Sequence, residues 1–378
     1  MRRELSGPET TFEREVQAFL DAHWGPHGTA GGADEESWRR ALVERGWSVP
    51  TWPAAAGGPG WSATQVFIWR RACAARGVVL EDDAAVDIVG PLLLRYADAA
   101  QQARYLPEIR NYGCRWCVGV AEPESGDDWS EMSTLAAQCG AGFELNGTKT
   151  WVRDGLHAQR MCCLARIDSA GSQGLFAVDM AAPGVTIASI ATLNGDAGMA
   201  QVTLDAVQVP ADALFAGPLE AGELATLLYA SESSTLSRSA VAAAQLDVLD
   251  EVIETFDRSD SIHQRRQAVA VELEGLKALE LRFLDARQRR QPLPFSLELL
   301  RLKSREILLQ LGALQVESFG YYALPYPDET LLHNEGPIGP ANAAATIRQT
   351  LTQQVAAIYE SSAERLKDAA WRGINTEG

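Results

Sequence analysis

Two pairs of cysteines have a spacing that could hold a metal ion. Cys114 and Cys117 are separated by two residues, as thiolate ligands of zinc often are, and Cys162 and Cys163 are adjacent. A structural zinc site needs four ligands, but neither a second pair with the two-residue spacing nor a spaced pair of histidines accompanies the first. Six cysteines in 378 residues also do not suggest a disulfide scaffold. We therefore expect buried strand cysteines in a reducing compartment and no metal site.

The segment between residues 116 and 151 is the most informative part of the chain. It opens with a short apolar run, residues 117–121, which stops near Pro123 at a polar loop that contains glycine. Further on, Asn146 and Gly147 separate two β-rich stretches, and both residues tolerate the positive φ of a two-residue hairpin turn. The pattern predicts a strand that ends in a loop, followed by a hairpin that turns at the Asn-Gly pair.

Hydrophobic periodicity divides the chain into three parts. The first part carries apolar side chains three or four positions apart, as helices do. The second contains short β-rich runs between glycine, asparagine and aspartate turns, which is typical of a small β-barrel or sandwich. The third returns to helical spacing. We therefore predict an α+β multidomain protein with an N-terminal helical domain at 1–112, a central β-barrel domain at 113–216 and a C-terminal helical bundle at 217–378.

The C-terminal part contains four long amphipathic patterns, separated at a proline pair near 292–294 and at a segment rich in proline and glycine, 325–340. The apolar positions that define them are Leu236, Val241, Ala244, Val248 and Val252; Val269, Leu273, Leu276 and Phe283; Leu300, Ile307, Leu311 and Leu314; and Ile347, Leu351, Val355 and Ile358. Four long amphipathic helices favour a four-helix bundle.

Charge and hydropathy exclude several classes of partner. The formal net charge of −17 argues against nucleic acid and against an anionic membrane surface, and it means that an anionic ligand needs local positive charge. No apolar run reaches the roughly 18–20 residues that cross a bilayer. The N-terminal residues lack the apolar core of a signal peptide. We expect a cytoplasmic protein.

Five motifs, in order along the chain, resemble those of the acyl-CoA dehydrogenase family. Arg45–Ser62 resembles its GWxxxxWPxxxGGxG signature, Gln101–Ile109 its QKxRYLPxI helix, Trp116–Asp128 its WCQGYSEPGAGSD segment, Leu145–Arg153 its LNGxKxWxT segment and Leu204–Pro210 its FDDVRVP strand. No single motif is decisive, but together with the helices that follow, their order and spacing match the family over most of the chain. The resemblance implies an α-domain, a β-domain and an α-bundle, in that order, with oxidoreductase activity, FAD as cofactor and an acyl-CoA substrate.

The reaction that the resemblance implies removes a proton from the α-carbon of an acyl thioester and transfers a hydride from the β-carbon to FAD. The α-proton is too weakly acidic for a carboxylate in water, so such a site needs a desolvated glutamate. The family places this base at one of two positions, and the chain has an acid at both. Glu232 lies in a stretch that resembles HERTSIAR, and Glu360 lies in one that resembles IYEGT. The alternative for either residue is a solvated helix position, which is usual for glutamate.

The resemblance also implies which residues hold FAD, and here the sequence departs from the family pattern. Val120, Ala121 and Trp151 match positions beside the flavin, although Ala121 replaces a hydroxyl residue and Trp151 could equally belong to the barrel core. Asp127 stands where the family has a serine that contacts the pyrophosphate, and a carboxylate there is repulsive. Arg153 replaces the hydroxyl residue that usually bonds the flavin ring, and the glycines of the last-helix motif are missing.

Two interpretations of function follow from the resemblance. In the first, the chain is a catalytic subunit that oxidises a bulky acyl group, because relatives with this pattern often act in steroid or branched side-chain degradation. In the second, it is a non-catalytic partner subunit that has lost its own FAD site and completes the site of a paralogue. Both imply an oligomer, and in such relatives the oligomer is often a heterotetramer of two unlike subunits. Asp127 and Arg153 favour the second interpretation, whereas the acids at both base positions favour the first.

Overall fold

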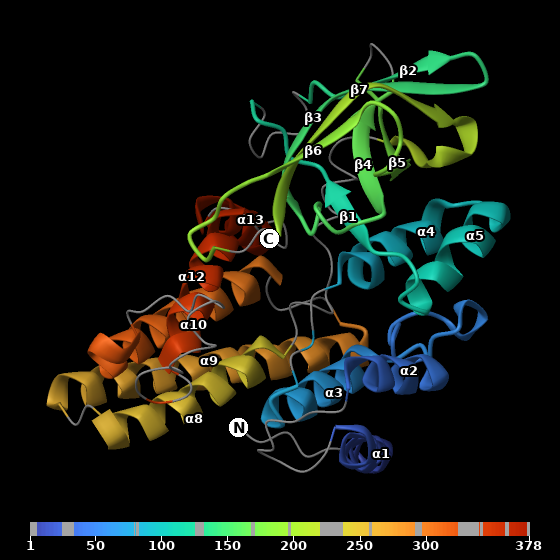
Figure 1. The fold of residues 1–378 in the computed structure, drawn as a ribbon. Helices are drawn as coiled ribbons and strands as arrows, with labels where there is room; N and C mark the ends of the chain where they lie inside the picture. Colours follow the sequence, from blue (N-terminus) through green and yellow to red (C-terminus); the bar gives the residue numbers. More distant parts are fainter. Residues whose placement is uncertain are drawn as a thin grey trace.

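A helical N-terminal part, a central β-sheet and a C-terminal helical bundle make up the fold (Figure 1). The computed structural model describes residues 6–24, 34–78, 80, 83–124, 132–167, 171–195, 198–219, 237–256, 259–291, 297–323, 340, 343–359 and 363–375. In Figure 1 the sheet lies at the top, the N-terminal helices lie at the lower right and the bundle lies at the lower left. The predicted fold class is confirmed, and the residues at which one domain ends and the next begins stay predictions.

Most of the long N-terminal helices begin at polar capping residues. Asp98 accepts a hydrogen bond from the backbone N–H of Gln101 at 2.8 Å, and the Gln101 side chain accepts one from the backbone N–H of Asp98 at 2.9 Å. Such reciprocal bonds satisfy N–H groups that a helix start otherwise leaves unpaired. The helices are α1 (Gly7–His23), α2 (Glu35–Arg45), α3 (Ala63–Ala75), α4 (Gly90–Tyr96) and α5 (Ala99–Arg110), with the short helical turns η1 (Ala54–Ala56) and η2 (Ala85–Val89) between them.

Aromatic side chains fill the core of this helical part. The ring centroids of Phe19 and Trp47 are 4.4 Å apart, and those of Trp47 and Trp69 are 5.2 Å apart. Trp52 belongs to a second buried cluster, which also contains side chains of the sheet, and its indole N–H donates to the Val86 carbonyl at 3.2 Å. The N-terminal helices therefore support one side of the β-domain through a continuous apolar contact.

Within the residues that the structure describes, eight strands form a single sheet. They are β1 (Trp116–Gly119), β2 (Leu135–Cys139), β3 (Gly142–Arg153), β4 (Arg160–Arg166), β5 (Gln173–Asp179), β6 (Val185–Ser189), β7 (Met199–Pro210) and β8 (Leu214–Leu219). The hydrogen-bonded order is β6-β7-β3-β2-β4-β5-β8, and β1 pairs with β4 in parallel. Cys117, Cys162 and Cys163 are buried on these strands, and Cys114 is partly buried just before them.

The predicted hairpin turn at Asn146 and Gly147 is wrong. The chain turns instead at residues 140–141, and β3 runs on through both residues. The register of β3 against β7 shifts between Leu145 and Gly147, which is the mark of a β-bulge. A Cβ atom at Gly147 would lie 2.4 Å from the hydroxyl oxygen of Thr134. The glycine therefore serves a close approach between neighbouring segments of the sheet and does not form a turn.

In the described residues of the C-terminal part, four long helices form a bundle, as predicted. They are α8 (Arg238–Phe256), α9 (Asp260–Arg289), α10 (Leu297–Phe319) and α12 (Ala343–Tyr359), with the short turn η5 (Gly320–Ala323) after α10 and the shorter helix α13 (Ala363–Asn375) after α12. On α8 the buried face differs from the predicted one, because Val241 is 43% exposed while Gln245 is buried. The Gln245 carbonyl accepts a hydrogen bond from the Gln315 side chain at 2.9 Å. In the described part of the chain, no helix is long and apolar enough to cross a membrane.

Substitution of two glycines by asparagine tests the position of the turn. Gly140 has a φ of 58° with open space around its Cα, and asparagine tolerates this conformation, so Gly140→Asn should lower the free energy of unfolding by less than about 1 kcal/mol. Gly147→Asn pushes a Cβ into Thr134 and should lower it by about 1–3 kcal/mol. Denaturant unfolding measures both changes. Equal stability of the two variants would contradict the strand position of Gly147.

Candidate active site

Lys149 and Glu122 form a buried ion pair between β3 and the segment that follows β1. The Lys149 ammonium lies 2.8 Å from Glu122 Oε1 and donates to the Val120 carbonyl at 3.2 Å. The two side chains are 0% and 2% exposed. Charges that are removed from water are stable only when their hydrogen-bonding groups are satisfied. The pair therefore fixes the backbone after β1 against β3.

Glu122 also binds the backbone beyond the next loop. Its Oε2 accepts from the N–H and from the hydroxyl of Ser133, both at 2.6 Å, and its Oε1 accepts from the N–H of Thr134 at 3.0 Å. These two residues follow the segment 125–131, which contains Asp127 and lies outside the described residues. A single carboxylate thus ties both ends of that segment to the lysine.

The contacts of Glu122 decide its charge state. Burial alone raises the pKa of a carboxyl group, but the ammonium of Lys149 and the hydrogen bonds from Lys149, Ser133 and Thr134 lower the pKa of Glu122 from 4.5 to about 2. The carboxylate is therefore ionised at neutral pH, and its negative charge balances the positive charge of the lysine.

Trp151 follows the ion pair along β3 but does not join the core of the sheet. It has a φ of 54°, and the register of β3 against β7 shifts just before Val152. Its side chain is 42% exposed, whereas Val152 is fully buried. The Ala121 carbonyl accepts from the N–H of Thr150 at 2.9 Å, which places Val120 and Ala121 beside this part of β3. The structure thus brings these three predicted cofactor residues together, and the alternative of a core position for the tryptophan is wrong.

Arg153 is the last residue of β3 and lies among carboxylates. Its Nε is 3.6 Å from an oxygen of Asp154, and its charge also acts on Asp83, which precedes η2 in the N-terminal part. Burial raises the pKa of Asp83, while hydrogen bonds from the backbone of Ala85 and Val86 and the charge of Arg153 oppose the rise. Sequence reasoning missed Asp83, because an aspartate before a helical run reads as a capping residue and nothing marks its approach to β3.

Helix α12 joins the bundle to the β-domain. The Asn194 side chain, in the loop after β6, donates to the Thr352 hydroxyl of α12 at 3.0 Å. Arg305 of α10 donates to the Ala357 carbonyl at 3.1 Å, two residues before the end of α12. The guanidinium thus satisfies an orphan carbonyl and complements the negative end of the helix dipole.

Three predicted site residues, Asp127, Glu232 and Glu360, lie outside the described residues, and their roles stay predictions. Their neighbours along the chain are described. Helix α8 begins at Arg238, six residues after Glu232, and α12 ends immediately before Glu360.

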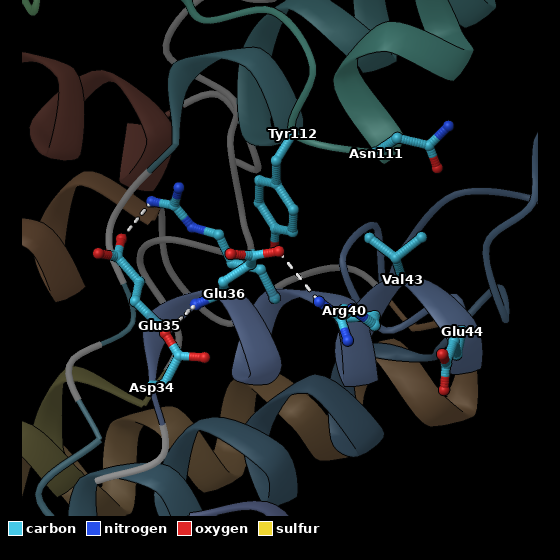
Figure 2. Close-up of a pocket in the computed structure, with 9 residues that line it drawn as sticks. Asp34, Glu35, Glu36, Arg40, Val43, Glu44, Asn111 and Tyr112 are labelled. Atoms are coloured by element: carbon cyan, nitrogen blue, oxygen red, sulfur yellow. Dashed lines mark hydrogen bonds and ion pairs between the residues drawn. The ribbon is translucent and has the colours of Figure 1, made fainter. Parts of the chain in front are cut away.

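An open pocket of about 560 Å³ lies elsewhere, between α2 and the end of α5 (Figure 2). Its arginines are paired with acids of the same helix, since Arg39 lies 2.6 Å from Glu35 and Arg40 lies 3.0 Å from Glu36. The Arg39 guanidinium also lies 5.4 Å from the centroid of the Tyr112 ring. None of the predicted site residues lines this pocket, and its charges largely satisfy one another, so it adds nothing to the site at β3.

Family models match the first two parts of the chain in the predicted order. The family model for the acyl-CoA dehydrogenase N-terminal domain matches residues 8–111, and that for the acyl-CoA dehydrogenase middle domain matches residues 117–207. Acyl-CoA dehydrogenase IpdE1 of Mycobacterium tuberculosis is 28% identical over 269 residues, which cover 68% of this chain and 70% of that protein.

Two solved structures share the fold over nearly the whole chain. The Tcur3481-Tcur3483 steroid ACAD has a TM-score of 0.79 at 18% identity, covering 98% of this chain and 97% of the other. The FAD complex of PigA has a TM-score of 0.78 at 16% identity, covering 100% of both chains.

The ion pair predicts a specific dependence of stability on pH. Because the pKa of Glu122 is about 2 in the folded state and 4.5 otherwise, its contribution is complete above about pH 4.5 and is lost as the pH falls towards 2. Glu122→Gln leaves a buried lysine uncompensated and should lower the free energy of unfolding by about 3–5 kcal/mol at pH 7. Urea unfolding between pH 7 and pH 3 should show a smaller loss of stability for this variant than for the wild type.

Two further variants serve as controls for that measurement. Glu144→Gln replaces a carboxylate of β3 that binds the exposed Gln208 side chain, and it should change stability by less than about 1 kcal/mol. Glu122→Gln combined with Lys149→Met removes both charges and keeps a side-chain oxygen for the N–H groups of Ser133 and Thr134, so it should cost less than Glu122→Gln alone. A double variant that is less stable than the single one would show that the pair is not a coupled unit.

Proposed function

The chain belongs to the acyl-CoA dehydrogenase family, and on this premise we propose that it catalyses the flavin-dependent α,β-dehydrogenation of a bulky acyl-CoA thioester. The observation that carries the proposal is the buried pair of Lys149 and Glu122, which holds residues 120–122 and the adjacent Trp151 in one arrangement. A partly exposed indole on a rigid strand, next to backbone amide groups, suits a flat and polar ring system.

The described residues fit FAD at three of the four predicted positions within them. Trp151 offers an aromatic face, and Val120 and Ala121 are partly buried beside it. Arg153 departs from the hydroxyl residue of the family pattern, but a cation at that position suits the negative charge of a reduced flavin ring. FAD bound at this site supplies the acceptor for the hydride that leaves the β-carbon.

Glu232 is the base in this proposal, and its carboxylate takes the proton from the α-carbon. Exclusion of water by the acyl group strengthens the carboxylate as a base. Glu232 lies in a stretch of small and serine-rich residues, which leaves room for a bulky acyl group. Glu360, which follows α12 directly in the sequence, is the alternative base.

The substrate class and the assembly follow the same relatives. Similarity to the Tcur3481-Tcur3483 steroid ACAD supports a steroid-like or branched acyl group and a role in lipid or steroid degradation. That structure is named after two proteins, Tcur3481 and Tcur3483. This supports assembly of this chain with a paralogous dehydrogenase subunit as a heterotetramer.

A second candidate function is a non-catalytic partner subunit, and one observation favours it. Arg153 lies near Asp83 and Asp154, so that charged groups gather where the family has an uncharged hydroxyl. Such a cluster could close the flavin site of this chain, which would then complete the site of its paralogue.

Paired substitutions distinguish the two functions. Arg153→Thr together with Asp127→Ser restores the hydroxyl groups of the family pattern. If Arg153 serves the cofactor, the double variant should retain at least about tenfold less FAD than the wild type, because the loss of a cation beside the ring weakens binding. FAD content after gel filtration is the measurement. Improved retention would indicate a closed site and favour the partner subunit.

Replacement of the base tests the proposed reaction. Glu232→Gln keeps the shape of the side chain and removes its basicity, so flavin reduction by an acyl-CoA should slow by roughly 10²–10⁴-fold while thioester binding persists. Stopped-flow absorbance of the flavin, with Glu360→Gln as the matched variant, makes the comparison. A slow Glu360→Gln and a normal Glu232→Gln would reassign the base. Wild-type rates in both variants would favour the partner subunit.

A further inference from the structure

Strand β6 lies at one end of the sheet order, so one of its edges has no neighbouring strand within the residues that the structure describes. Its 5 residues pair with β7 in a continuous register, without a bulge. The N–H and carbonyl groups along the other edge therefore remain available to a further strand. Exposed edges of this kind bind another strand unless the sequence protects them.

The backbone bonds on either side of β6 show which residues offer those groups. The Gly184 carbonyl accepts from the Asp205 N–H at 3.0 Å, and the Ile190 N–H donates to the Met199 carbonyl at 2.8 Å. Residues that bond a neighbour alternate along an antiparallel strand, so the even-numbered residues of β6 face β7. The backbone groups of the odd-numbered residues therefore point to the open edge. These residues are Val185, Ile187 and Ser189.

The sequence protects the other end of the sheet but not this one. Strand β8 contains Pro218, and its register against β5 shifts twice, so it offers no regular edge. By contrast, residues 180–195 contain no aspartate, glutamate, lysine or arginine, although 22% of the chain is charged. Lysines and inward-facing charges are the usual protection of an edge strand. The free edge of β6 is therefore open to pairing.

A second copy of this chain suits the edge for two reasons. The formal net charge is −17, so two copies repel one another over most of their surfaces. A neutral strip is the place where they can meet without that repulsion. In addition, two identical strands that pair antiparallel about a twofold axis leave no further edge free, so the contact closes after two copies.

We propose that two copies of this chain pair through β6, antiparallel about a twofold axis at Ile187, and so join their sheets. In this register the Ile187 residues of the two copies exchange two hydrogen bonds. Each Ser189 N–H donates to a Val185 carbonyl of the other copy, while the Val185 N–H keeps its bond to the Ala182 carbonyl at 3.1 Å. The half-buried side chains of Val185 and Ile187 pack against the core of the sheet, and the second copy covers them further.

The strands alone are too small for a stable contact, so residues around β6 belong to it as well. Specific interfaces usually bury about 1,200–2,000 Å² of surface, which is more than two short strands provide. Leu193, in the neutral stretch after β6, is 66% exposed and enlarges the apolar area. The loop that carries it is fixed, since the buried Asn194 side chain donates to the Thr352 hydroxyl of α12.

Charge substitutions on β6 test both the contact and its register. Thr186 and Ala188 are exposed, and in the proposed register each lies opposite the other residue of the second copy. Thr186→Lys with Ala188→Lys puts lysine opposite lysine, and Thr186→Glu with Ala188→Glu puts glutamate opposite glutamate. A mixture of the two double variants puts lysine opposite glutamate. Ala137→Lys with Cys139→Lys is the matched control, because both residues are exposed on β2, which lies between β3 and β4 in the sheet order.

Sedimentation equilibrium of the full-length chain, alone and with a paralogous subunit, measures the dissociation constant between two copies. The lysine and the glutamate variants should each weaken the pairing by at least about tenfold, because like charges directly opposite repel. The mixture should regain the wild-type dissociation constant within about threefold, since opposite charges attract across the same pair. The control should match the wild type, and urea unfolding should show that all variants are folded.

Other results overturn the proposal. A wild-type chain that has the mass of one copy at micromolar concentration, and whose complex also contains one copy, contradicts it. A lysine variant that pairs as tightly as the wild type contradicts it too, as does a mixture that does not regain pairing. An assembly of one copy with an unlike subunit that both β6 variants disrupt would assign the edge to that subunit instead. Flavin reduction plays no part in these outcomes, so the pairing stands or falls independently of the proposed reaction.

Discussion

The arrangement of the candidate site depends on one buried ion pair, between Lys149 and Glu122. Neither charge reaches water, so each needs protein partners, and these come from the Val120 carbonyl and from Ser133 and Thr134. Satisfying the two charges forces the end of β1, the middle of β3 and both ends of the segment 125–131 into one arrangement. The surface beside this pair, with its exposed indole on β3, follows from that constraint.

A second buried carboxylate solves a similar problem in the bundle. The buried carboxylate of Glu280, on α9, accepts hydrogen bonds from backbone N–H groups at the start of α8. In both places a carboxylate gathers amide and hydroxyl donors from segments that are distant in sequence. Arg305 does the converse for α12, since its guanidinium binds a carbonyl near the end of that helix. Charged side chains therefore hold the start of α8, which follows Glu232 in the sequence, and the end of α12, which precedes Glu360.

Periodicity was sufficient for the helices, the β-rich runs and the order of the three parts, because those features depend on local apolar patterns. It failed where tertiary contacts determine the position of a turn or the buried face of a helix. Gly147 lies in a strand despite its turn preference, because it closely approaches Thr134. The buried face of α8 was predicted wrongly because the Gln245 side chain is buried, where its oxygen accepts a hydrogen bond from the Gln353 side chain at 3.3 Å. Of the site, the resemblance named Val120, Ala121 and Trp151, which the structure places near one another, and their role in binding FAD stays a prediction. Asp83 and Glu280 could not be predicted, since their roles depend on partners that the sequence does not place next to them.

The most direct test of the account is the FAD content of the purified protein, measured by visible absorbance for the chain alone and for its complex with a paralogous subunit. The account predicts one bound FAD for each copy of this chain, with flavin absorbance that bleaches when a bulky acyl-CoA is added. A colourless chain, together with a complex in which FAD is absent or is not reduced by any acyl-CoA, would contradict it.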